Sequence, residues 1–134
     1  MIVSDDRAAR FVSDALGVGF CPPWTAMGIE TDGQIIAGVI FNCFEGADVH
    51  VSIAGTGWTR AFIKAVGRYV YGTLRCERMT VLTENEAVAS YALRLGGQIE
   101  GRLRNHFGKG RDAILVGILR DEWRYGSKDA LAHG

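Results

Sequence analysis

The stretch VSIAGTGWTRAF, from Val51 to Phe62, joins a strand pattern to a helix pattern through two glycines. Apolar and polar residues alternate from Ala47 to Ala54, up to the first of these glycines, as in a half-buried strand. Apolar residues then recur at helical spacing over about Trp58–Leu74, and RMTVLT (78–83) is typical of a second strand. A strand, a helix and a strand in this order predict a right-handed crossover that places the two strands parallel in one sheet.

The rest of the chain alternates in the same way. We expect a helix over 5–16 capped by Ser4, a hairpin within 25–44 turning at Asp32-Gly33, a helix over 85–95, and strands over 97–107 and 112–123. One mixed, mostly antiparallel sheet with helices on both faces would bury all the apolar stripes. The pattern therefore predicts an α+β fold in three α/β/α layers, forming one domain over 1–125 with a frayed tail at 126–134.

Composition limits the class of protein. The chain has 134 residues, enough for one core, and its fifteen basic and fifteen acidic side chains cancel. No apolar run approaches membrane-spanning length, and the charged N-terminus is unlike a signal peptide. Three cysteines without metal-ligand spacing predict reduced thiols, no metal and a cytoplasmic location.

The Gly55-Thr56-Gly57 turn has two interpretations. Glycines at the start of a helix let backbone N–H groups approach a phosphate, and Arg60, Lys64 and Arg68 place a basic stripe beside them. The same turn also serves any strand that passes directly into a helix, and a basic stripe is often a solvated helix face. The turn alone leaves both interpretations open.

The segment from Asn85 onward resembles the C-terminal half of the GNAT acyl-CoA N-acyltransferases. Its markers are Asn85, Leu95-Gly96, Glu100-Gly101, Leu103-Arg104 and Glu122-Trp123. The likeness is greatest to the branch that contains the ribosomal-protein N-terminal acetyltransferases, and it covers roughly residues 26–123. The chain is also similar to compact members of the family found in phages and prophages. The resemblance implies a GNAT fold, acetyl-CoA as acyl donor and direct transfer to an amine.

The resemblance also implies a donor site. The strand 49–54 would diverge from the strand 78–83, and the donor would lie between them, with its pyrophosphate on the glycine turn. Asn85 would cap its helix and also reach the pantetheine arm. The implied donor-binding residues are Ser52, Ile53, Ala54, Gly55, Thr56, Gly57, Trp58, Thr59, Arg60, Lys64 and Asn85.

The sequence departs from the family pattern at several positions. Ala54 and Thr59 stand at the ends of the phosphate loop, where other residues are usual, and Ala92 stands where many members have a tyrosine. Tyr91 is one residue early and is either a core aromatic or the acid that protonates the thiolate. Ser90 is a candidate polar neighbour of the sulfur.

The candidate general base is His50, on the polar face of its strand, although a strand histidine with a purely structural role fits the pattern too. Asp48 and Glu84 are the fallbacks, and deprotonation through water needs no base at all.

Two other functions remain open. One is a GNAT-fold module that binds CoA or another ligand without catalysis. The other is a phage-type acyltransferase acting on nucleic-acid bases, suggested by His106 and the basic residues Arg102, Arg104, Lys109 and Arg111. The expected partner is an amine-bearing protein N-terminus, peptide or small molecule, with no membrane involved and a homodimer left open.

Overall fold

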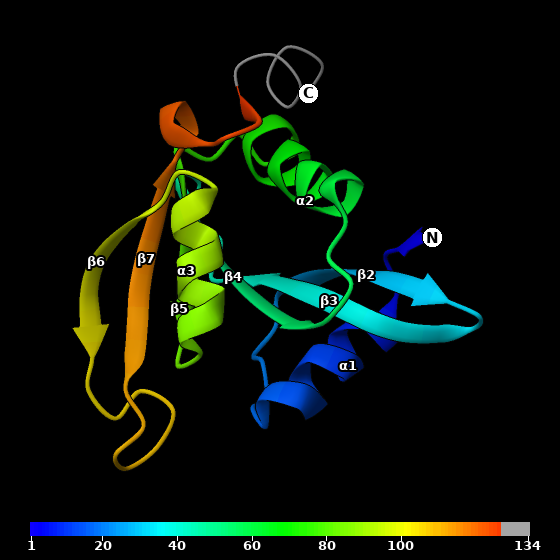
Figure 1. Cartoon of the computed structure of the whole chain (residues 1–134), viewed down its shortest axis with the longest axis horizontal. Helices are drawn as coiled ribbons and strands as arrows, with labels where there is room; N and C mark the ends of the chain where they lie inside the picture. Colours follow the sequence, from blue (N-terminus) through cyan, green and yellow to red (C-terminus); the bar gives the residue numbers. More distant parts are fainter. Residues whose placement is uncertain (127–134) are drawn as a thin grey trace.

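The computed structural model describes residues 1–126, which form one seven-stranded sheet flanked by helices (Figure 1). The strand order is β1-β2-β3-β4-β5-β7-β6, and only β4 and β5 are parallel. The strands are β1 (Ile2–Val3), β2 (Trp24–Thr31), β3 (Gln34–Asn42), β4 (Asp48–Gly55), β5 (Arg78–Thr83), β6 (Gln98–Leu103) and β7 (Ala113–Leu119). The helices are α1 (Asp6–Leu16), α2 (Arg60–Gly67) and α3 (Glu86–Arg94).

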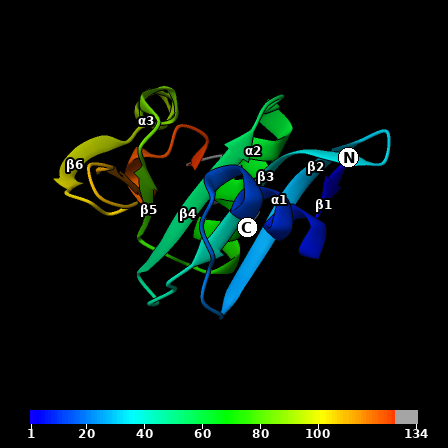
Figure 2. The same cartoon turned by 90° about the horizontal axis from the view of Figure 1, so that it is seen from below.

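This arrangement confirms the expected three-layer α+β fold with a mixed, mostly antiparallel sheet. Helix α1 covers one face of β2, β3 and β4, where Val12 and Ile40 are fully buried. Helices α2 and α3 cover the opposite face, over the core that contains Val51, Phe62 and Val81. Figure 2 shows α1 and α2 on opposite sides of β3 and β4. Apolar residues on both faces of the central strands are thereby buried, as a sheet between helix layers requires.

The N-terminal half follows the sequence pattern with two differences. Asp32 and Gly33 both have positive φ (52° and 79°), as a tight two-residue hairpin turn needs, and they join β2 to β3. The cap of α1 is Asp5 and not Ser4, because the Asp5 carboxylate accepts the Arg7 amide at 2.9 Å. The short strand β1, which pairs with β2, was not expected.

The helix predicted over Trp58–Leu74 changes form along its length. Its first part, α2, is α-helical, and a π-helix follows from Arg68 to Thr73. The wider turn is visible in the hydrogen bond from the Leu74 amide to the Tyr69 carbonyl, at 2.8 Å. Tyr71 lies in this π-helix, fully buried, and donates its hydroxyl to the Ile118 carbonyl at 2.6 Å.

The C-terminal strands are shorter than predicted. β6 ends at Leu103, where Asn105 adopts a positive φ of 58°, and β7 ends at Leu119 before a 3-10 turn over Arg120–Glu122. Trp123 then packs back into the core, 4% exposed. Most of the tail predicted to be frayed, 127–134, lies outside the described residues. Within residues 1–126, no helix is long and apolar enough to cross a membrane.

Candidate functional site

The two parallel strands separate part of the way along their length. The β4–β5 pairing runs from Asp48–Arg78 to Val51–Val81 and stops there. Beyond Val51, β4 continues to Gly55 while pairing only with β3, and β5 continues to Thr83 while pairing only with β7. The β5-facing edge of β4 from Ser52 onward therefore has no strand partner among the described residues. Its backbone groups are available to a ligand.

The glycine turn follows this free edge. Gly55 and Gly57 both have positive φ (103° and 75°). The Thr56 amide donates to the Ile36 carbonyl at 3.0 Å, so this amide of the expected pyrophosphate site is not available to a phosphate. Gly55 pairs with Ala37 in the sheet and leaves no room for a side chain, since an added Cβ would lie 2.3 Å from the Ile36 oxygen.

The amides that start the helix have no such partners. The Thr59 side chain caps α2 by accepting the Phe62 amide at 3.1 Å. No protein acceptor within residues 1–126 takes the amides from Gly57 to Ala61. A helix N-terminus of this kind carries partial positive charge and suits an anion. The potential phosphate nest thus comprises the amides of 57–61, whereas the predicted nest comprised those from Gly55 to Arg60.

The face covered by α2 and α3 is tightly packed at the divergence. A void of about 40 Å³ lies between the two helices, lined only by apolar and aromatic side chains that include Trp58, Tyr91 and Trp123. A second void of about 40 Å³, beside Asn85, shares Ile53 and Val81 with the first. Neither space holds a pantetheine arm, so a donor would lie along the open edge of β4 and not inside a preformed tunnel.

The opposite face carries a larger cleft, which we call the His50 cleft. Its volume is about 350 Å³. The end of α1 and the chain after it, the end of β3, the middle of β4, Leu82 of β5 and the β6–β7 loop enclose it. Its apolar lining is Leu16, Val18, Phe20, Val51, Leu82 and Phe107, and its polar lining is Asn42, Cys43, His50, Ser52 and His106, with Gly19. It shares Leu16, Leu82 and Phe107 with the void beside Asn85, so donor and acceptor spaces would meet at the divergence.

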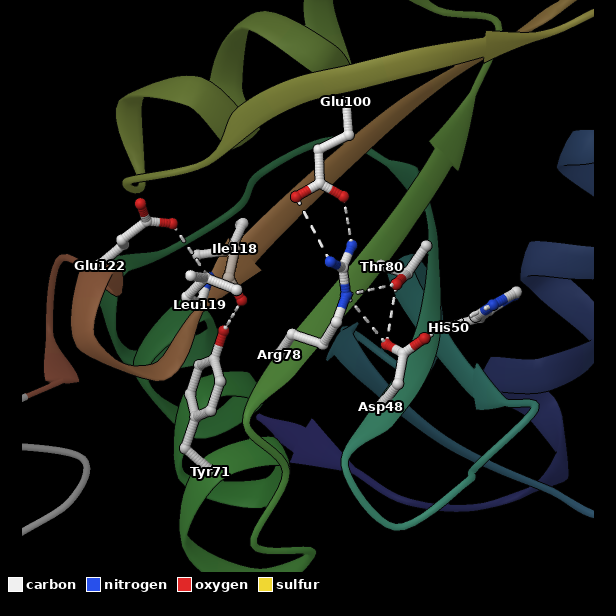
Figure 3. Close-up of polar contacts among 9 residues, drawn as sticks. All are labelled: Asp48, His50, Tyr71, Arg78, Thr80, Glu100, Ile118, Leu119 and Glu122. Carbon is white, nitrogen blue, oxygen red and sulfur yellow. Dashed lines mark hydrogen bonds and ion pairs between the residues drawn. The ribbon is translucent and has the colours of Figure 1, made fainter.

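Charged groups form a network next to His50 (Figure 3). The His50 Nε2 atom lies 4.0 Å from Asp48 Oδ2, and Asp48 Oδ1 accepts the Thr80 hydroxyl at 2.8 Å. Arg78 Nε lies 3.6 Å from the same Asp48 oxygen, and its Nη2 lies 2.6 Å from Glu100. The hydrogen bonds that Arg78 donates to Glu100 raise the pKa of Arg78, so this guanidinium is permanently charged. Asp48 is held in one orientation by Thr80 and Arg78, and it lies close to His50 without a hydrogen bond between them.

This network explains why the fallback bases fit less well than His50. Asp48 is already engaged by Thr80 and Arg78, and Glu84 pairs with Arg111. The Arg111 hydrogen bond lowers the pKa of Glu84, which makes that carboxylate a weaker base. Of the three candidate bases, His50 lines the cleft, and Asp48 and Glu84 do not.

Other predicted site residues are placed elsewhere. Ser90 is exposed and lines none of these spaces, so it is not brought near the free strand edge. Tyr91 faces the void between α2 and α3, where burial raises its pKa, consistent with the core alternative. Asn85 caps α3 by accepting the Ala87 and Val88 amides, at 2.8 and 3.4 Å.

The remaining predicted donor residues divide between the two faces. Ala54 packs on the α1 side, Arg60 is exposed at the start of α2, and Lys64 lies 5.5 Å from the centre of the Tyr125 ring.

The Arg78–Glu100 pair and the cleft lining from the chain after α1 were not predicted. They depend on contacts between distant segments, for which the local sequence pattern carries no signal.

A sheet with one parallel pair that separates in front of a helix N-terminus is the fold of the GNAT acyltransferases, and this chain has that fold. No protein-family model matches the sequence, and no curated protein matches it either.

Solved structures of similar fold include N-acetyltransferases. One is the spermidine/spermine N-acetyltransferase SpeG from Vibrio cholerae in mutant form, with a TM-score of 0.72, 15% identity, and coverage of 96% of this chain and 99% of that one. Another is the ribosomal-protein-S5-alanine acetyltransferase from Vibrio fischeri, with a TM-score of 0.59, 20% identity, and coverage of 75% of this chain and 63% of that one.

Proposed function

We propose that this chain is an acetyl-CoA-dependent N-acetyltransferase that transfers the acetyl group directly to an amine. The observation that carries the proposal is the end of the β4–β5 pairing at Val51–Val81, ahead of a helix whose first amides have no protein acceptor within residues 1–126. A thioester donor needs both features: free strand edge for its amide-bearing arm and an anion site for its pyrophosphate. In the proposed complex the amides from Gly57 to Ala61 bind the pyrophosphate, and Arg60 adds a charge-assisted contact to a phosphate.

The reaction places the amine in the His50 cleft and the thioester at the divergence. The amine nitrogen attacks the thioester carbonyl carbon, the carbonyl oxygen becomes an oxyanion, and the C–S bond then breaks to release the CoA thiolate. A backbone N–H on the free edge near Ser52 to Ala54 stabilises the oxyanion. His50, close to Asp48, takes the proton from the attacking amine, and the leaving thiolate takes a proton from water.

Isothermal titration with acetyl-CoA tests the proposal, followed by a thiol-release assay with a panel of amines. We expect saturable binding at micromolar to millimolar donor, and free CoA produced only when an amine is present. A chain that shows no heat of binding at millimolar donor is not an acetyl-CoA enzyme. Binding without any transfer across the panel would favour the alternative of a non-catalytic module.

A further inference from the structure

We infer that the His50 cleft accepts an amine carried on an apolar, uncharged body, and that it excludes polyamines. The inference concerns which molecules the cleft can bind. It rests on the proposed function only where it calls such a molecule the acceptor. Spermidine N-acetyltransferases have a similar fold, which makes a polycation the obvious alternative.

The first argument is the lining of the cleft. Among the described residues that line it there is no Asp or Glu, and the apolar part includes the aromatic rings of Phe20 and Phe107. A polyamine carries several ammonium groups, and each would lose its water here without gaining a carboxylate. An apolar body instead gains free energy by leaving water.

The second argument is the state of the carboxylates around the cleft. Asp48 is held by Thr80 and Arg78, and Glu84 by Arg111. Glu100 is engaged by the same Arg78. Each of these three carboxylates therefore already has an arginine partner, although Asp48 and Glu100 share the single charge of Arg78.

The loop that carries His106 and Phe107 adds exposed cations. Arg104 and Lys109 are exposed on it. Their positive potential repels a polycation and has little effect on a monoamine that binds in its neutral form. Acyl transfer requires that neutral form, and a cleft without carboxylates favours it by disfavouring the ammonium.

The size of the cleft fits such an acceptor. Its volume, about 350 Å³, lies at the lower end of the range of small-molecule sites. An amine one or two carbons from an aromatic or aliphatic group therefore fits. A small arylalkylamine has this chemistry, and so does a peptide whose first residue is apolar.

Cys43 offers a readout that needs neither acetyl-CoA nor turnover. It is exposed and lines the cleft, and Cys21 is also exposed, whereas Cys76 is buried and burial raises its pKa. In a Cys21→Ser protein, alkylation by iodoacetamide therefore reports on Cys43. We expect saturating 2-phenylethylamine to slow alkylation by about tenfold or more, and spermidine to leave the rate unchanged.

Two further arms sharpen the experiment. A tripeptide beginning with phenylalanine, with a free amino terminus, distinguishes a peptide source from a small amine, and protection by either supports the inference. Asn42→Asp, a nearly isosteric change that adds one carboxylate to the lining, should make spermidine protect Cys43. The inference is overturned if spermidine protects Cys43 in the protein that retains Asn42. It is also overturned if 2-phenylethylamine, the tripeptide and spermidine all fail to protect Cys43 there. Donor binding, measured separately by titration, decides the proposed function independently.

Discussion

The guanidinium of Arg78 and the carboxylate of Glu100 meet 2.6 Å apart across the backbone of Gly117 (Figure 3). The pair joins β5 to β6 over the intervening β7. A Cβ at position 117 would lie 2.4 Å from Glu100 Oε2 and 2.5 Å from Arg78 Nη2. The absence of a side chain at Gly117 is therefore what allows the pair to form and hold Arg78 beside Asp48.

Gly117→Ala should separate this pair and lower stability by about 1 kcal/mol, because the two flexible side chains can move apart. The same substitution in a Glu100→Gln background should have a smaller effect, since the ion pair is already lost. Urea unfolding of the four proteins gives the coupling energy. Equal effects in the two backgrounds would mean that Gly117 serves only backbone packing.

Gly67→Ala tests the packing of α2 on Trp123. A Cβ there would lie 2.3 Å from the indole Nε1, and the rigid ring is 4% exposed. Alanine normally stabilises a helix interior by about 0.5–1 kcal/mol relative to glycine. Here we expect a loss of about 1–3 kcal/mol in the free energy of unfolding. In a Trp123→Leu background the substitution should regain its normal stabilising sign.

Tyr71→Phe removes the hydrogen bond to Ile118 and should reduce stability by about 1–2 kcal/mol at neutral pH. Burial raises the pKa of Tyr71 above its unfolded value near 10. The unfolded chain therefore ionises first, and this tyrosine's contribution is complete below about pH 10 and is lost as pH rises further. Thermal melts across that range should show a shallower alkaline decline for Tyr71→Phe than for wild type. Tyr69→Phe, which keeps Tyr71, should retain the wild-type slope.

Gly57→Asp and Gly57→Asn form a matched pair for the phosphate nest. Both residues tolerate the positive φ at this position, and an added Cβ would lie 3.1 Å from the Ile36 Cδ1 atom, so the Ile36 side chain must shift slightly in both variants. Only Asp places a carboxylate against a pyrophosphate, so we expect its acetyl-CoA affinity to fall by about tenfold or more relative to Asn. Titration of both variants measures this difference, and equal affinities would remove the 57–61 amides from the donor site.

His50→Gln should lower kcat by about 100-fold or more and change the shape of the pH–rate profile, because it removes the proposed base. Its effect on acetyl-CoA affinity should be small, because His50 lines the His50 cleft, which is the proposed acceptor site and not the proposed donor site. A pH profile identical to that of wild type would assign deprotonation to water. Thr80→Val, which removes the hydroxyl bound to Asp48, should reduce kcat less than His50→Gln does.

Local patterns in the sequence were sufficient wherever one short segment decides the outcome. The Asp32-Gly33 turn, the Asn85 cap and the strand 78–83 are where the pattern predicts them. The π-helix was not predictable in this way, because Tyr71 packs against a carbonyl 47 residues away. The free Gly57–Ala61 amides were only partly predictable, since the use of Thr56 depends on Ile36 from another strand.

By itself the sequence determined the order and type of the elements and the strand–helix–strand crossover, because periodicity and turn chemistry act over a few residues. Only the tertiary structure decided where β4 and β5 separate, which amides stay free, and which carboxylates are neutralised by arginine. These outcomes depend on side chains brought together from distant segments, and their distances and burial are fixed when the two faces of the sheet are packed.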